Sequence, residues 1–333
     1  MRIFDNPNIN FIKWRWHALI LSLVVIGAGI FSIVKQGGLP LGVDFSGGTV
    51  MILKFTQPTS EDAVRSALPF AGEAVVQTIG KAGDNTVMVR LPMTGGAEEE
   101  TNLEAKALQV ETALRTAKVG DFTIESKELV GPVMGQDLRN KGLWATIASL
   151  GGIMAYIWFR FRLTFAIGAI VATLHDVLVT VVFLNWFGYD ISLNVVAALL
   201  TITGYSVNDT IVIFDRVREN QRATRREPLE SVVNRSVNQT LSRTIITAGT
   251  TFLSVIALFL FGGEVLQGLS FTLLVGIVTG TYSTVFIASA IAIMLSPRTP
   301  SEGSAATAAA PKAREAEPAR TKVGAGTGKA RRA

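Results

Sequence analysis

Cysteine is absent from the 333 residues of this chain, histidine occurs only twice, and charged residues make up 17% of the sequence. The lack of cysteine excludes disulfide bonds, thiolate chemistry and cysteine-based metal sites. Charge is scarce, because soluble domains carry about 25% charged residues. With 49% hydrophobic residues and a mean hydropathy of +0.39, the composition excludes an ordinary soluble enzyme.

Six stretches are long and apolar enough to cross a membrane, which takes about 20 residues. They cover residues 17–34, 142–159, 163–187, 191–214, 244–263 and 265–296. The first follows basic residues, as the core of a signal peptide would, but it is too long for one and no Ala-x-Ala cleavage site follows it. We therefore interpret 17–34 as an uncleaved anchor after a short N-terminal segment, 1–16.

The orientation follows from the basic residues in the short connections between spans. Arg160 and Arg162 make one connection basic, and the loop predicted at 215–243 carries seven arginines. The connections near Asp190 and Glu264 contain no lysine or arginine. Because basic connections stay in the cytoplasm, both termini are predicted to be cytoplasmic.

The segment 35–141 then lies on the outer side, with 11 basic and 14 acidic residues and a net charge of −3. A segment of this length can bury its own core. The pattern predicts strands at 49–55, 74–79, 86–91 and 122–130 and helices at 60–69 and 98–118. This βαββαβ order is that of a ferredoxin-like unit. The predicted fold is thus a polytopic α-helical membrane protein, with spans two to six in 142–299 and an extracytoplasmic ferredoxin-like domain.

The last segment, 300–333, is rich in alanine, proline, glycine and basic residues without apolar periodicity, which predicts a disordered basic tail in the cytoplasm. Its 7 basic and 3 acidic residues supply most of the chain's net charge of +5. The argument for a nucleic-acid partner depends mainly on the positive charge of this tail. A basic tail beside a membrane more often meets anionic lipid, ribosomes or nothing specific, so we expect membrane lipids and no nucleic acid.

Three charged residues lie inside a predicted span or at its start, where charge is costly and marks a candidate functional site. They are Asp176, Asp209 and Arg243. A rise of 1.5 Å per residue places Asp209 about 9 Å from the cytoplasmic boundary, the side from which Arg243 enters, so the two could pair. Asp176 lies about 20 Å from that boundary, near the midplane or in the outer half.

Each of these residues has polar neighbours on its own helical face. The neighbours are Asn194, Thr201, Tyr205 and Asn208 for Asp209, Thr247, Thr250 and Ser254 for Arg243, and Thr173 and Thr180 for Asp176. One interpretation is a proton relay, in which an acid moves between a buried environment and one beside an arginine. The other is interhelical hydrogen bonding that only locks the bundle together. Spacing alone leaves both open.

His175 and Asp176 are adjacent, but adjacent helical residues point about 100° apart and no third ligand is suitably spaced, so we expect no metal and no cofactor. Two glycine-containing motifs, GVDFSGG at 42–48 and GPVMG at 131–135, flank the outer domain. The first lacks the ending of a phosphate-binding loop. We predict turns that couple the spans to the domain and act as hinges, formed by Gly42, Asp44, Gly47, Gly48, Gly131 and Gly135.

These two motifs, the LHDV stretch at 174–177 and the block YSVNDTIVIFDR at 205–216 resemble the SecD/SecF family of protein-export membrane proteins. The resemblance runs from about residue 11 to residue 297. The VDFS stretch at 43–46 and the single outer domain of modest size resemble the SecF members. The larger SecD members typically have leucine and arginine at the positions of Phe45 and Ser46.

The resemblance implies a bacterial plasma-membrane subunit, related to the RND transporters, that pairs with SecD beside the SecYEG channel, with YajC and YidC as further candidate partners. It also implies that inward proton flow moves the outer domains and draws preproteins across the membrane. By resemblance, the family's membrane acid is Asp209, its membrane arginine is Arg243, and its His-Asp pair is His175 and Asp176. We expect Asp176 and Asn208 to support this proton path.

Two rival functions stay open. One is a half-size RND-type exporter of small molecules or lipids, and the other is a scaffold that stabilises the translocon without using protons. A small-molecule exporter usually needs large paired outer loops, whereas this chain has one outer segment, 35–141, which favours protein export. We expect no enzyme, because the sequence offers no nucleophile–base set and no metal cluster.

Overall fold

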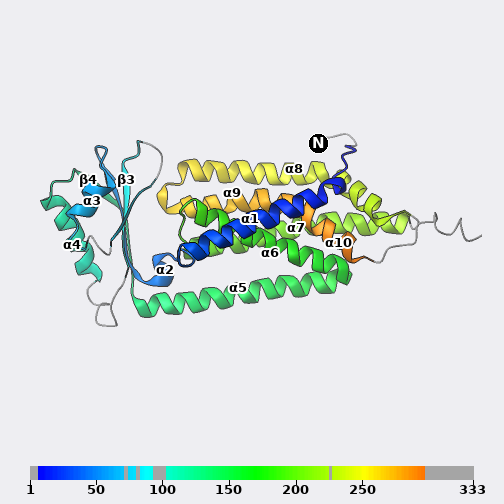
Figure 1. Ribbon diagram of the computed structural model, residues 1–333, viewed down its shortest axis with the longest axis horizontal. Coiled ribbons are helices and arrows are strands. Elements are labelled where there is room, and N and C mark those ends of the chain that lie inside the picture. Colours follow the sequence, from blue (N-terminus) through cyan, green and yellow to red (C-terminus); the bar gives the residue numbers. More distant parts are fainter. Residues whose placement is uncertain (1–6, 71–73, 80–82, 93–102, 225–226, 297–333) are drawn as a thin grey trace, which may run out of the picture. The chain divides into compact units, whose positions relative to one another are not determined.

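The computed structural model describes residues 7–70, 74–79, 83–92, 103–224 and 227–296, and the predicted tail 300–333 lies outside these ranges. Six helical segments in the described ranges are long and apolar enough to cross a membrane, as predicted. They are α1 (Arg15–Lys35), α5 (Pro132–Arg160), α6 (Leu163–Trp186), α7 (Leu193–Ala223), α8 (Leu229–Phe261) and α9 (Gln267–Ser283), the last continuing through a π turn at Thr284–Ala288 into α10 (Ser289–Leu295) (Figure 1).

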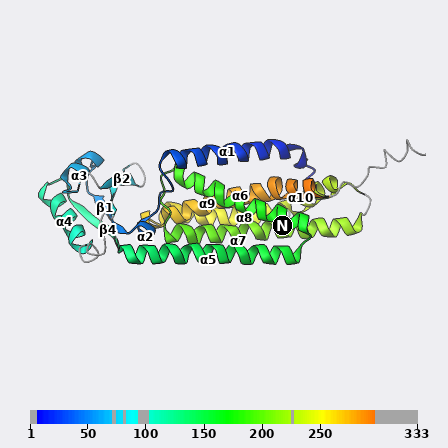
Figure 2. The same ribbon diagram turned by 60° about the horizontal axis from the view of Figure 1, so that its bottom comes forward.

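The spans run side by side, and α6 and α9 lie at the centre of the bundle (Figures 1 and 2). Within their most apolar windows, 56% of α6 and 61% of the α9–α10 span are buried by the rest of the protein, against 6% of α5. A short 3-10 turn at Ile12–Trp14 leads into α1, which packs along α6. The central position of α6 and α9 makes polar residues on them parts of the protein interior.

The loop predicted at 215–243 is wrong, because most of it is helical. Helix α7 continues to Ala223 and α8 begins at Leu229, so only a short connection separates them. Buried valines at Val217, Val232 and Val237 pack the two extensions together, and the Asn220 amide bonds Ser236 Oγ at 2.8 Å. The arginines lie between these buried positions, as on any amphipathic helix.

The outer domain has the predicted βαββαβ order. Its elements are β1 (Gly48–Phe55), α3 (Glu61–Ala67), β2 (Val75–Ile79), β3 (Thr86–Pro92), α4 (Leu103–Thr116) and β4 (Phe122–Val130). The strands form one antiparallel sheet in the order β2-β3-β1-β4, with β1 between β3 and β4. This is the split topology of the ferredoxin-like unit. The first residues of the predicted helix 98–118 lie outside the described ranges.

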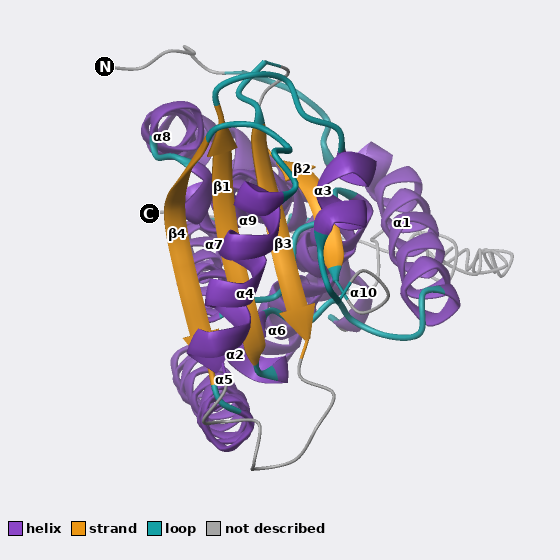
Figure 3. Cartoon of the chain, turned by 90° about the vertical axis from the view of Figure 1, so that its left-hand side faces the viewer, coloured by secondary structure: helices purple, strands orange, loops and turns teal. Residues whose placement is uncertain are grey.

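Helices α3 and α4 cover one face of this sheet (Figure 3). Alternate strand residues point to that face, so Met51 and Leu53 of β1 and Val87 and Val89 of β3 are buried beneath the helices. The intervening residues point to the other face. Ser60 caps α3 by accepting a hydrogen bond from the backbone N–H of Ala63.

Candidate functional site

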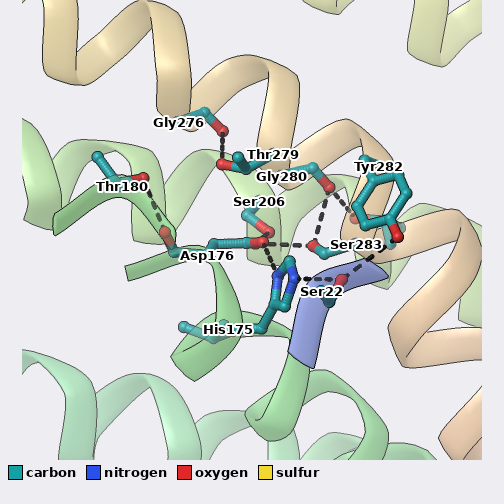
Figure 4. Close-up of polar contacts among 12 residues, drawn as sticks. Ser22, His175, Asp176, Thr180, Ser206, Gly276, Thr279, Gly280, Tyr282 and Ser283 are labelled. Carbon is teal, nitrogen blue, oxygen red and sulfur yellow. Dashed lines mark hydrogen bonds and ion pairs between the residues drawn. The ribbon is translucent and has the colours of Figure 1, made fainter. Parts of the chain in front are cut away.

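Asp176 of α6 lies at the centre of a buried hydrogen-bond network (Figure 4). Its Oδ2 accepts hydrogen bonds from Ser206 Oγ of α7 at 2.5 Å and from Ser283 Oγ of α9 at 2.8 Å. Its Oδ1 lies 3.0 Å from Nδ1 of His175. Both carboxylate oxygens therefore have partners, and the side chain joins three helices.

His175 extends this network to α1. Its Nε2 lies 2.9 Å from Ser22 Oγ, which lies 3.3 Å from the Tyr282 hydroxyl (Figure 4). Tyr282 donates to the backbone carbonyl of Ala18 at 2.7 Å. The expectation that the His175 and Asp176 side chains diverge is therefore wrong: rotation about their side-chain bonds brings the ring and the carboxylate together. No group of three His, Cys, Asp or Glu residues in the described ranges is placed to hold a metal ion.

Asp209 of α7 has a different environment. Its Oδ1 accepts a hydrogen bond from Thr244 Oγ1 of α8 at 2.8 Å. Its Oδ2 is buried and has no hydrogen-bond partner among the described residues. Arg243 precedes Thr244 and is close enough for its charge to act on Asp209, but no ion pair within 4.0 Å joins them in the described part of the chain. The predicted Asp209–Arg243 pair is thus not formed in this structure.

Most of the polar residues predicted on one face of α7 and of α8 are exposed on this chain; Tyr205 differs, because its side chain is partly buried and its hydroxyl is buried. Asn194, Thr201 and Asn208 are exposed on α7, and Arg243, Thr247, Thr250 and Ser254 are exposed on α8. Polar and charged groups within a membrane-spanning helix do not face hydrocarbon stably. These faces therefore require a protein partner or water against them.

Ser206 and Asp209 lie on different sides of α7. Ser206 is buried toward Asp176, whereas Asp209 is half-buried toward α8. Thr210 donates to the Ser206 carbonyl at 3.1 Å and lies 3.2 Å from Thr284 Oγ1, next to the π turn. No hydrogen bond among the described residues joins Asp209 of α7 to the network around Asp176 of α6, so the two acids occupy separate sites on neighbouring helices.

The GVDFSGG motif contacts the N-terminus of α7. Its middle residues form the helical turn α2 (Val43–Ser46), and Asp44 Oδ2 accepts a 2.7 Å hydrogen bond from the backbone N–H of Leu193. The Gly42 N–H donates to the Ile191 carbonyl at 2.8 Å. Asp44 thus caps the helix that carries Asn208 and Asp209, which places the motif between the outer domain and that helix.

The glycines of the two motifs serve close packing and a sharp turn. Gly47 and Gly48 have φ values of +72° and +131°, and β1 begins at Gly48. Gly131 precedes α5 in extended conformation, but Gly135 lies within the first turn of α5 rather than at a break. A Cβ on Gly135 would lie 3.1 Å from the Gly47 backbone nitrogen, so Gly135 allows α5 to approach the first motif.

The chain matches known protein families over most of the residues described above. The family described as protein export membrane protein SecD/SecF, C-terminal, matches residues 109–298, and the SecD/SecF GG motif matches residues 31–59. Protein translocase subunit SecF of Rhodothermus marinus is 42% identical over 316 residues, covering 92% of this chain and 100% of the relative. The chain belongs to the SecF family. The SecF subunit of Escherichia coli O157:H7 is 39% identical, covering 86% of this chain and 87% of the relative.

Two solved SecDF structures share the fold. The crystal structure of SecDF from Thermus thermophilus matches with a TM-score of 0.77 and 33% identity over 87% of this chain. SecDF in the super-membrane-facing form matches with a TM-score of 0.60 and 34% identity over 88% of this chain. The present chain spans 39% of the length of each SecDF chain. These matches confirm the resemblance to the SecF family and the polytopic fold with a small sheet domain.

Several residues of this SecF-family site carry no clear signal in the sequence. Ser22 is a single polar residue on an apolar helix face, and Ser206, Ser283 and Tyr282 lie among other hydroxyl side chains from which nothing in the sequence distinguishes them. One signal in the sequence does point here: Gly276 and Gly280 of α9 form a G-x-x-x-G pair, which indicates close helix approach. Gly280 of this pair packs on Ser206, since a Cβ there would lie 3.1 Å from Ser206 Cβ.

Proposed function

We propose that this chain is an accessory subunit of the Sec protein translocase that, with SecD, uses the proton gradient to promote translocation of preproteins. Membership of the SecF family supports the translocase role. The proton role is supported by the half-buried membrane acid Asp209, with Arg243 nearby. No covalent catalysis is part of this proposal.

The observation that carries the proposal is the unequal environment of the two Asp209 oxygens. Oδ1 is bonded to Thr244, whereas Oδ2 is buried without a partner among the described residues. A buried oxygen without a donor is costly as part of a carboxylate, and protonation relieves that cost. Approach of the Arg243 guanidinium would favour the charged form instead. A change in the separation of these two side chains would therefore load and release a proton.

Asp176 and Asn208 have supporting roles in this scheme. Asp176 holds α6, α7 and α9 together through Ser206 and Ser283, which fixes the helix that carries Asp209. Asn208 adjoins Asp209 and is exposed on the polar face of α7. It is placed to hydrogen-bond water or a partner helix beside the acid.

The exposed polar faces of α7 and α8 are the surface on which we place SecD. A SecD partner is supported by the SecD/SecF family match and by the SecDF structures, because this protein covers only 39% of the length of each SecDF chain. SecYEG, YajC and YidC are proposed as further partners, with preproteins as the substrate. Both termini are proposed to be cytoplasmic in the bacterial plasma membrane, with the segment 35–141 outside.

Motion of α7 would reach the outer domain through the GVDFSGG motif. Asp44 caps α7, and the Gly42 N–H donates to the Ile191 carbonyl just before this helix. Gly47, Gly48, Gly131 and Gly135 supply the turns and close contacts where strand β1 and helix α5 leave this point. We propose that these residues couple the outer domain to the membrane bundle and act as the hinge between them.

The test is Asp209→Asn in a preprotein translocation assay with SecD and the translocon present. We expect loss of the stimulation that a proton gradient provides, with assembly of the complex unchanged. The matched control is Asp215→Asn, further along α7, whose carboxylate pairs with Arg160 at 2.8 Å at the end of the span. This control should retain the stimulation. Unchanged gradient-dependent translocation in Asp209→Asn would reject the relay and favour a scaffold.

A further inference from the structure

Arg90 of β3 joins the outer domain to the membrane bundle. It lies opposite Val50 of β1, on the sheet face away from α3 and α4. Its guanidinium donates to Asp190 Oδ2, in the connection between α6 and α7, at 2.8 Å. It also donates to the Leu41 carbonyl and lies 3.4 Å from Ser46 Oγ. One side chain from the sheet thus contacts the segment before α2, α2 itself and the entry to α7.

Carboxyl groups outnumber cations at this junction. Glu128 of β4 also lies opposite Val50, so it shares the sheet face with Arg90. Asp44 of α2 is close enough to act electrostatically on Glu128. We call these four residues the junction cluster: Arg90, Asp44, Glu128 and Asp190. It contains three carboxyl groups and one guanidinium.

The neighbouring element α5 does not balance this excess of acid. Among the charged residues in its first turns, Asp137 and Lys141 pair with each other at 2.7 Å and are largely exposed. Arg139 is exposed as well. When all three carboxyl groups of the junction cluster are ionised, the cluster therefore carries excess negative charge in a partly enclosed place.

The pKa values of Asp190 and Glu128 are both shifted in the direction expected for an excess of partly buried acid. Burial raises the pKa of Asp190 above its ordinary value, and the charge and hydrogen bond of Arg90 offset only part of that rise. Partial burial, and then the Asp44 charge, raise the pKa of Glu128. An acid whose pKa is higher in the assembled junction than in water binds a proton more tightly when the junction is assembled. Lower pH therefore favours assembly, and higher pH opposes it.

We propose that the junction cluster is a proton-binding site outside the membrane, which takes up a proton from the solution on the domain's side as the sheet closes onto the entry to α7. Its part in export rests on the proposed function above. The proton is shared between Asp190 and Glu128, and the Arg90 guanidinium pairs with the carboxylate that stays ionised. The site responds to the pH of the solution on the domain's side of the membrane, whereas Asp209 lies within the membrane span α7.

The test is a distance measurement between spin labels on Thr112→Cys of α4 and Phe261→Cys at the end of α8. Both positions are exposed, and the chain has no cysteine of its own. The labelled full chain is reconstituted with SecD, whose own cysteines are replaced, and the pH is lowered stepwise from mildly alkaline to mildly acidic. We expect the distribution of distances to narrow to a single closed population as the pH falls.

Three variants make the result specific. In Glu128→Gln with Asp190→Asn, the closed population should be present at every pH and the pH response lost. Glu128→Gln alone removes the more exposed of the two acids, leaves Asp190 in place, and should weaken the response. Asp137→Asn is the matched control and should leave it unchanged. A response that survives in the double variant, or a native distribution that does not change with pH, overturns the proposal.

The same measurement in Asp209→Asn separates the two proposals. The junction response should persist there, because the cluster lies outside the span. Loss of the response in Asp209→Asn would overturn the junction proposal and assign the pH dependence to the membrane acid. Conversely, a junction response together with unchanged translocation in Asp209→Asn would reject the relay and leave the junction site in place.

Discussion

The Ser206 hydroxyl of α7 and the Asp176 carboxylate of α6 form a 2.5 Å hydrogen bond in the buried centre of the membrane bundle. With Ser283 and His175 also bonded to Asp176, this acid has the environment of a structural group. Asp209, on the same helix as Ser206, has one oxygen without a partner. The geometry of Asp176 is that of a packing group, and the proposed function places proton exchange at Asp209 instead.

Replacement of Ser206 by alanine tests the packing role. Ser206→Ala removes one of two hydroxyl donors to a buried Asp176 oxygen, and a hydrogen bond to a charged group contributes about 1.5–3 kcal/mol. We expect a loss of stability at the low end of this range, because bonds between membrane helices are weaker. Thermal unfolding of the purified protein measures it. Ser254→Ala, whose exposed hydroxyl bonds only the Thr250 carbonyl, should be neutral; equal losses would reject the role.

Thr244 is a testable partner of Asp209. Thr244→Val keeps the side-chain shape but removes the 2.8 Å hydrogen bond to Oδ1. A hydrogen bond worth about 0.5–1.5 kcal/mol corresponds to a change of about 2–13-fold in proton affinity. We expect a comparable reduction in proton-gradient-stimulated translocation, measured over a range of pH. Thr240→Val is the control, since this buried hydroxyl on α8 bonds only backbone carbonyls. Equal activity of the two variants would contradict the prediction.

The spans and the sheet could be predicted because their signals repeat along the chain. Apolar runs define the helices, and alternation such as that of Met51, Leu53 and Phe55 defines a strand with one buried face. The prediction of a loop at 215–243 was wrong because buried valines lie between its arginines and extend both α7 and α8. Helical periodicity in those valines would have indicated the extensions of α7 and α8.

The candidate functional residues also differ in whether the sequence alone could predict them. Asp176, Asp209 and Arg243 stand out because charge is rare in a span. Their partners Ser206, Ser283 and Thr244 do not, because serine and threonine are common on these helices, and which hydroxyl bonds an acid depends on which helices become neighbours. The Arg90–Asp190 pair joins residues 100 positions apart, so only the folded chain reveals it.

Loss of Arg90 should affect stability in a pH-dependent way. Arg90→Met leaves Asp190 partly buried without its cation, which costs about 1–3 kcal/mol when the carboxylate is charged. The pKa of Asp190 is already raised by burial, and removal of Arg90 raises it further. The cost is therefore largest at alkaline pH and shrinks as acid neutralises Asp190. Thermal unfolding at both pH extremes measures this difference. Arg65→Met is the control: it breaks an exposed contact with Asp62 and a 3.3 Å hydrogen bond to the Val76 carbonyl, but leaves no buried carboxylate unpaired, so its cost should not change with pH. An equal cost of Arg90→Met at both pH values would contradict the argument.

Gly47 should be sensitive to any side chain. Its φ of +72° with ψ of 160° lies in a region that only glycine occupies readily, so Gly47→Ala should cost of the order of 1–3 kcal/mol through backbone strain. The strain falls between α2 and β1, where the outer domain meets the entry to α7, so translocation should decline as well as stability. Gly151→Ala is the matched control, because a Cβ there meets nothing within 4 Å and alanine favours the surrounding helix α5. Thermal unfolding and translocation measured together decide the outcome. If Gly47→Ala matched Gly151→Ala in both, the turn at Gly47 would not need its glycine, and its assignment as a coupling point would fail.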